Sequence, residues 1–191
     1  GEYPSFHMLD AAQLSRLPSS SLVVSAGRGE VVATEELLQL RELRPDIELA
    51  LDVWEGEPGV SRELAGQCLI ATPHIAGYSL AGKLRGSEML YQKLCTYLNQ
   101  PADKTIQALL PDPLQFDMQH YDIKTLFTAV YPILQDDGAL RETLSQGSSG
   151  FDLLRKNYAV RRELSQVTLI NCDGYQGRAL AALGFNVSST N

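Results

Sequence analysis

The chain has 191 residues, of which 44% are hydrophobic, 20% charged and 7% aromatic, and its formal net charge at neutral pH is −7. These fractions are typical of a globular protein and exclude a disordered or collagen-like chain. The acidic charge offers no overall attraction for nucleic acid or an anionic membrane surface, and no apolar run approaches the roughly 20 residues of a membrane span. We therefore expect no nucleic-acid partner, no membrane partner and a cytoplasmic location.

Three cysteines stand far apart in the sequence, at Cys68, Cys95 and Cys172. No CxxC pair occurs, so the pattern predicts neither a structural zinc site nor a disulfide framework. Each cysteine lies in an apolar stretch, which is typical of a small buried hydrophobic side chain. We expect reduced, buried cysteines and no bound metal.

The first hundred residues alternate between helix-like and strand-like patterns. Asp10, with Gln13 three positions later, predicts the start of a short helix, and Thr34 is a candidate N-cap for a second helix. Three apolar runs are typical of strands and cover residues 21–26, 47–53 and 68–72. Continuous apolar strands joined by helices indicate parallel strands covered on both faces. The pattern predicts an α/β fold, with one half of a doubly wound, Rossmann-like parallel sheet.

The second half of the chain has a different character. A long helix is predicted from Ser79, and residues 99–101 stop it. Beyond Pro111 and Pro113 short helical and strand-like patterns alternate. The helical patterns cover about 123–134, 138–145, 151–164 and 176–183, and the strand-like ones 167–171 and 185–187. We therefore predict that residues 103–191 form a separate small α/β domain.

Polar residues that suit chemistry follow the three strand-like runs of the first half. Arg28 follows the first run, Asp52 lies at the end of the second with Glu57 after it, and His74 follows the third. In an open parallel sheet, ligands bind beyond the carboxyl ends of the strands, so these side chains can line one crevice. Taken singly, each would suit a solvated turn or a structural histidine. Their joint placement at successive strand ends is what indicates a site.

The residue types at this crevice suit the oxidation of a hydroxy acid. An arginine offers a bidentate fork for a carboxylate, and a histidine accepts a proton near neutral pH. A glutamate behind the histidine orients the ring and favours its charged form. We predict that Arg28 holds the carboxylate and His74 removes the hydroxyl proton, while a cofactor takes the hydride.

Three blocks of the first half carry a family resemblance. They read SAGRGEVV at residues 25–32, LDVWEGEP at 51–58 and TPHIAGY at 72–78. In order and spacing they resemble the signature blocks of the D-isomer-specific 2-hydroxyacid dehydrogenases, over roughly residues 5–98. The resemblance implies an NAD-dependent 2-hydroxyacid dehydrogenase with NAD as cofactor.

The resemblance also implies a role for individual residues. Arg28, Glu57 and His74 would be catalytic, with Glu57 pairing with the histidine. Arg28 and Tyr78 would bind the substrate. The residues implied to contact the cofactor are Ala26, Gly27, Arg28, Asp52 and Gly77.

The second half resembles the C-terminal dimerisation domain of one branch of the family, through FDLLRKNY at residues 151–158. This resemblance implies a homodimer and a small phosphorylated hydroxy acid as substrate. It divides the chain into three parts. Residues 1–80 would be the C-terminal half of the NAD-binding domain, 81–102 a long helix linking toward the substrate domain, and 103–191 the dimerisation domain.

A cluster of basic residues falls in the second half, within the helix predicted over about 151–164. It comprises Arg155, Lys156, Arg161 and Arg162. Residues seven positions apart share a helix face, so Arg155 and Arg162 would border one apolar stripe. Such a stripe suits a dimer interface, and its cations could also reach a substrate phosphate.

The glycine-rich loop that holds a cofactor's pyrophosphate, GxGxxG, does not occur in this sequence. We therefore expect the chain to be the C-terminal half of a longer dehydrogenase and to be inactive when isolated. Two alternatives stay open. One is another 2-hydroxyacid dehydrogenase, such as one acting on phosphoglycerate, and the other is a non-catalytic NAD-sensing dimerisation protein of the corepressor kind.

Overall fold

Three short parallel strands form the sheet of the first half of the chain. In the computed structural model, which describes residues 4–145 and 150–188, the predicted runs become β1 (Leu22–Ser25), β2 (Glu48–Leu51) and β3 (Ile70–Ala71). Their order is β1-β2-β3, and Leu51 of β2 lies opposite Ala71 of β3. The predicted α/β class and parallel half-sheet are therefore confirmed.

The first helix, α1 (Ala11–Leu14), begins at the predicted capping box. The Asp10 carboxylate accepts the N–H of Gln13 at 2.6 Å, and the Gln13 side chain accepts the N–H of Asp10 at 3.0 Å. Two N–H groups that the helix itself leaves without partners are satisfied in this way.

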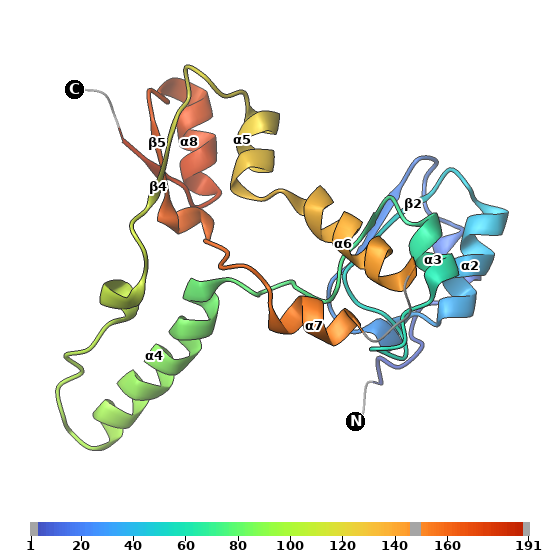
Figure 1. Cartoon of the computed structure of the whole chain (residues 1–191), viewed down its shortest axis with the longest axis horizontal. Helices are drawn as coiled ribbons and strands as arrows, with labels where there is room; N and C mark the ends of the chain where they lie inside the picture. The colour runs from blue at the N-terminus through green and yellow to red at the C-terminus, as the bar shows by residue number, and fades with distance from the viewer. Residues whose placement is uncertain (1–3, 146–149, 189–191) are drawn as a thin grey trace. The chain divides into compact units, whose positions relative to one another are not determined.

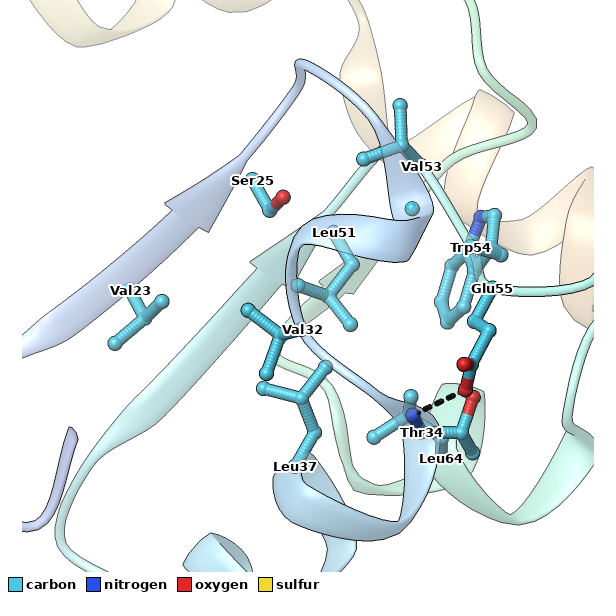
Figure 2. Close-up of a pocket in the computed structure, with 11 residues that line it drawn as sticks. Val23, Ser25, Val32, Thr34, Leu37, Leu51, Val53, Trp54, Glu55 and Leu64 are labelled. Carbon is cyan, nitrogen blue, oxygen red and sulfur yellow. Dashed lines mark hydrogen bonds between the residues drawn. The ribbon is translucent and has the colours of Figure 1, made fainter. Parts of the chain in front are cut away.

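The second helix, α2 (Thr34–Leu43), has a different N-cap residue from the one that the sequence predicts. Thr34 is its first residue and not its N-cap. Glu55, from the loop after β2, accepts the N–H of Thr34 at 2.7 Å, and this bond holds the pKa of the Glu55 carboxyl below its usual range (Figure 2). The predicted capping role of Thr34 is wrong, because a carboxylate distant in sequence satisfies the start of the helix.

A small cavity lies behind this contact, between the ends of β1 and β2 and the start of α2 (Figure 2). Its lining is mostly apolar, and it includes Val23, Val32, Leu37, Leu51 and Leu64. A volume of about 20 Å³ leaves room for about one water molecule. The cavity is therefore a packing gap beneath the loop and is too small to hold a cofactor.

The chain forms two compact units, and the first contains more than the half-sheet. It comprises the described residues up to Ala76 together with Ile133–Tyr158. Helix α3 (Arg62–Gln67) precedes β3, and helix α6 (Ile133–Ser145), which is followed by α7 (Phe151–Lys156), lies beside the sheet (Figure 1). The unit boundaries therefore differ from the predicted division at residue 103.

The reason for this difference is apolar packing. Leu140 and Leu144 of α6 and Phe151 of α7 are buried in the same core as Leu40 and Leu49. Burying a large apolar side chain is worth roughly 1.5–3 kcal/mol, so these three residues hold the returning segment on the first unit. Their spacing gives no sign of which core they enter.

The second unit comprises Gly77–Pro132 and the described residues from Ala159 onward. It begins with the predicted long helix α4 (Leu80–Tyr97), which Ser79 caps by accepting the N–H of Gly82 at 2.9 Å. A second parallel sheet follows, in the order β4-β5-β6. Its elements in chain order are η2 (Ile106–Leu109), β4 (Leu114–Asp117), α5 (Ile123–Val130), η4 (Leu164–Gln166), β5 (Val167–Ile170), α8 (Gly174–Ala182) and β6 (Asn186–Val187).

One helix of the second half is much shorter than predicted. α7 ends at Lys156, and Arg161 is bridged to Ser79 as in a parallel sheet. The Arg161 carbonyl accepts the N–H of Leu80 at 3.0 Å, so the backbone at residue 161 bonds to the start of α4. The prediction that Arg155 and Arg162 share a helix face is therefore wrong.

The three cysteines are free and buried, as predicted. Burial raises the pKa of the Cys68 thiol to about 12, so this thiol stays protonated and unreactive. Among the helices of residues 4–145 and 150–188, none is both long and apolar enough to cross a membrane.

The loop after β1 is pressed against the loop after β2 at Gly29. A Cβ atom added there would stand 2.1 Å from the carbonyl carbon and oxygen of Trp54. We expect Gly29→Ala to lower the free energy of unfolding by about 2 kcal/mol or more, since overpacking against backbone cannot relax cheaply. Urea denaturation measures the loss.

Gly27 is the matched control, because an added Cβ there would meet nothing within 4 Å. Gly27→Ala should leave the free energy of unfolding within about 0.5 kcal/mol of the parent. Equal stability of the two variants would show that the two loops are not in contact.

Candidate active site

The candidate side chains lie beyond the carboxyl ends of three neighbouring strands. Arg28 stands three residues after the end of β1, exposed and with extended backbone. Glu57 follows β2, and His74 stands three residues after the end of β3. Because the strands are parallel and adjacent, all three residues belong to the same edge of the sheet.

Glu57 and His74 form a hydrogen-bonded pair. Glu57 Oε2 accepts from His74 Nδ1 at 2.7 Å, and both side chains are about 20% exposed. A carboxylate only accepts, so a ring proton lies on Nδ1, and in the neutral form of this tautomer Nε2 carries the lone pair. Glu57 thus sets the tautomer of the His74 ring, in which Nε2 is the atom that can accept a proton.

The other oxygen of Glu57 fixes the carboxylate itself. Glu57 Oε1 accepts the backbone N–H of Trp54 at 2.7 Å. Trp54 is buried, and its indole N–H donates to the Thr72 carbonyl at 2.9 Å. The glutamate is therefore held by the loop after β2, which is itself tied to the segment that carries the histidine.

The backbone of His74 has an uncommon conformation, with a φ of +53°. Positive φ costs about 1–3 kcal/mol for a residue with a side chain and persists only where neighbouring contacts impose it. Asp52 supplies such contacts. Its Oδ1 accepts the Ile75 N–H at 2.9 Å, and its Oδ2 accepts the Ala76 N–H at 2.8 Å.

Asp52 also accepts the hydroxyl of Thr72 at 2.6 Å, and both residues are buried. Three of the roughly four acceptor positions of the carboxylate are therefore used within the protein. The contact of Asp52 with the cofactor stays a prediction, and the structure adds that Asp52 shapes the loop around His74.

Sequence reasoning missed the parts played by Thr72 and Trp54. Thr72 gave a usable signal, since it is a polar residue that ends a buried strand immediately before Pro73 and His74. Trp54 gave none, because an aromatic residue after a strand is ordinarily core.

The remaining predicted residues are only partly brought together. Ala26 and Gly27 are exposed at the end of β1, in the same unit as His74. Gly77 and Tyr78 begin the second unit, where the Lys83 ammonium lies 3.9 Å from the centre of the Tyr78 ring. Their cofactor and substrate contacts stay predictions.

The arginines of the basic cluster make separate contacts within the two units. Arg162 donates to the carbonyls of Pro111 and Asp112, and the Arg161 guanidinium lies 3.9 Å from the centre of the Tyr131 ring. Arg155 instead belongs to the first unit, where its Nε donates to the His74 carbonyl at 3.2 Å.

A parallel half-sheet with an arginine, a buried aspartate and a glutamate–histidine pair at its carboxyl edge is the arrangement expected of an α/β enzyme that binds its ligand beyond the ends of the strands. Two family models match the chain. Residues 4–76 match the model described as D-isomer specific 2-hydroxyacid dehydrogenase, NAD binding domain. Residues 111–184 match a domain of unknown function (DUF3410).

Curated relatives extend the similarity to nearly the whole chain. The chain is 41% identical to a Shewanella sp. (strain DB6705) protein over 97% of its length, and 40% identical to one from Pseudoalteromonas translucida over 99%. It is 43% identical to a Pseudomonas aeruginosa protein over 86%. All three are named erythronate-4-phosphate dehydrogenase.

The chain therefore belongs to the D-isomer specific 2-hydroxyacid dehydrogenase family. Within that family, the relatives that match it along its length are erythronate-4-phosphate dehydrogenases. The chain spans 74% of the Shewanella relative, but only 52% and 46% of the other two. The predicted family is confirmed, as is NAD as the cofactor of the matched domain.

The three bonds of Asp52 make a prediction about stability. Asp52→Asn replaces one acceptor oxygen with an amide that donates, so one N–H or hydroxyl of the loop loses its partner. We expect a loss of about 2–3 kcal/mol in the free energy of unfolding, measured by urea denaturation. Asp10→Asn is the control, since asparagine caps a helix about as well as aspartate and the change should be small.

Proposed function

We propose that this chain supplies the catalytic residues of an NAD-dependent dehydrogenase that oxidises 4-phospho-D-erythronate to 3-hydroxy-2-oxo-4-phosphooxybutanoate, in the synthesis of pyridoxal phosphate. The observation that carries the proposal is the 2.7 Å bond between Glu57 Oε2 and His74 Nδ1, which leaves His74 Nε2 as a proton acceptor. The names of the relatives support the choice of substrate.

Each residue at the carboxyl edge of the half-sheet has its own role in the proposed reaction. Arg28 binds the substrate carboxylate through two parallel hydrogen bonds and polarises the carbon beside it. His74 Nε2 takes the proton of the hydroxyl on that carbon. Glu57 stabilises the charged ring that results. Tyr78 contacts the substrate in the complete site.

The backbone at the carboxyl edge of the half-sheet also leaves room for NAD to bind. Ala26 and Gly27 are exposed, and a Cβ on Gly27 would meet only open space, so a ligand can approach this backbone closely. Ala26, Gly27, Arg28, Asp52 and Gly77 would hold NAD. When bound, NAD supplies the acceptor for the hydride that leaves the carbon as its hydroxyl is deprotonated.

The test is steady-state oxidation of 4-phospho-D-erythronate by the full-length protein. His74→Ala should lower kcat by about a hundredfold or more, because a positioned general base is lost. Arg28→Lys keeps the charge but loses the fork, so kcat/KM should also fall by about tenfold or more.

Two results would contradict these assignments. Normal turnover of His74→Ala across the pH range would exclude His74 as the base. Recovery of most of kcat/KM in Arg28→Lys would show that charge alone binds the carboxylate. A full-length protein that binds NAD and oxidises no hydroxy acid would favour the sensing protein instead.

We also propose that the full-length protein is a cytoplasmic homodimer held by the domain at residues 103–191. Free, buried cysteines suit a reducing compartment. On and just after α8, Tyr175 is 82% exposed and Leu183 is 58% exposed, and tyrosine is enriched at protein interfaces.

Light scattering of the intact protein should give the mass of two chains, and a Tyr175→Asp/Leu183→Asp variant should give a smaller dimer fraction. Point substitutions are cleaner than deletion of residues 103–191, which would also remove Leu140 and Phe151 from the core of the first unit. A monomeric intact protein would refute the dimer.

A further inference from the structure

Part of the domain of unknown function packs within the first compact unit. Its match covers residues 111–184, yet α6 and α7 from the middle of that range pack on the half-sheet. Both helices touch the segment from Ala71 to His74, which leads from the last strand to the candidate base. The two contacts are separate and polar.

The first contact lies at the edge of the sheet. Within the described part of the chain β3 pairs with β2 alone, and on its other side the Ala71 N–H donates to Asp137 Oδ1 at 2.7 Å. Asp137 is in turn held by Arg141, whose Nε and one terminal nitrogen donate to the two carboxylate oxygens at 2.8 and 2.9 Å. A carboxylate of α6 thus takes the place of a fourth strand at this residue.

Arg141 anchors that carboxylate to the end of α3. Two of its three remaining N–H groups donate to the Ala65 carbonyl at 2.7 Å and the Cys68 carbonyl at 2.9 Å. Carbonyls at a helix C-terminus lack partners within the helix and favour a cation. Asp137 is therefore fixed in position by a bidentate pair and not by one flexible bond.

The second contact lies on the candidate base itself. Arg155 Nε donates to the His74 carbonyl at 3.2 Å, and the side chain of Arg155 is only 27% exposed. Its guanidinium carbon lies 6.0 Å from the ring centre of Phe151, which is fully buried. α7 therefore holds the carbonyl of a residue whose φ is positive and whose ring is held by Glu57.

We propose that Asp137 and Arg155 are positioning residues for His74, so that one task of the C-terminal domain is to fix the base of the dehydrogenase. Only Thr72 and Pro73 separate the two clamped residues, so little of the segment is left free to move. The proposal rests on the proposed function, because it takes His74 as the base. A misplacement of about 1 Å at a catalytic group can cost up to a hundredfold in rate.

The test uses the full-length protein with Arg155→Met and Arg155→Lys. Methionine keeps an unbranched side chain of similar length but donates no hydrogen bond, whereas lysine still donates. We expect Arg155→Met to lower kcat by about tenfold or more, with KM and NAD affinity changed by less than about twofold. Arg155→Lys should recover most of kcat. Lys156→Met, an exposed neighbour on the same helix, is the control that should change nothing.

Histidine-selective isotope labelling gives a readout that does not depend on activity. The signal of the His74 Nδ1–H, bonded to Glu57, should be present in the parent and in Arg155→Lys, and broadened or lost in Arg155→Met. Asp137→Asn keeps an acceptor for Ala71 but weakens the pair with Arg141, and it should weaken the same signal.

Separate outcomes decide the two proposals. Unchanged kcat and an unchanged Nδ1–H signal in Arg155→Met, beside an impaired His74→Ala, would overturn the positioning role alone. A fall in melting temperature with normal kcat per folded molecule would overturn it too, since the contact would then only stabilise the fold. Normal turnover of His74→Ala would overturn the proposed function, whatever the signal shows.

Discussion

The site depends on one buried carboxylate. Asp52 directly follows the central strand β2 and accepts three hydrogen bonds, two from the backbone just after His74 and one from the Thr72 hydroxyl before it. A buried charge is costly unless such bonds compensate it. The turn is thereby fixed around the carboxylate, so the histidine ring meets Glu57 at the distance that selects its tautomer. The position of the candidate base therefore depends on the three hydrogen bonds of a single buried aspartate.

Local signals made the half-sheet predictable. Apolar runs, the capping box at Asp10 and the periodicity of the long helix after Ser79 act over a few residues, and each element forms as the sequence predicts. The pairing of Glu57 with His74 was also within reach, because parallel strands bring their carboxyl ends together. Contacts between residues far apart in the sequence were not predictable from such local signals. Glu55 at the start of α2 and Arg155 on the His74 carbonyl depend on tertiary packing, which no periodicity encodes.

The second half shows how tertiary contacts override a helical pattern. The helical periodicity extends from 151 to 164, but the chain leaves the helix at Lys156 and pairs Arg161 with Ser79 as an extended bridge. The basic residues are thereby distributed over separate tasks. Arg155 serves a backbone carbonyl near the site, while Arg161 and Arg162 serve an aromatic ring and a loop. Neighbouring charges in the sequence therefore make unrelated contacts in the fold.

The interleaved course of the chain has a consequence during synthesis. The first unit is begun by residues before Ala76, but its core lacks Leu140, Leu144 and Phe151 until a further stretch has been translated. A nascent chain therefore carries an unfinished apolar surface while the ribosome makes α4 and the first strand of the second sheet. Contacts between residues so far apart in sequence form slowly, because a long loop must close first. During the time between the synthesis of residue 76 and that of Phe151, the incomplete core exposes apolar surface to which a chaperone can bind.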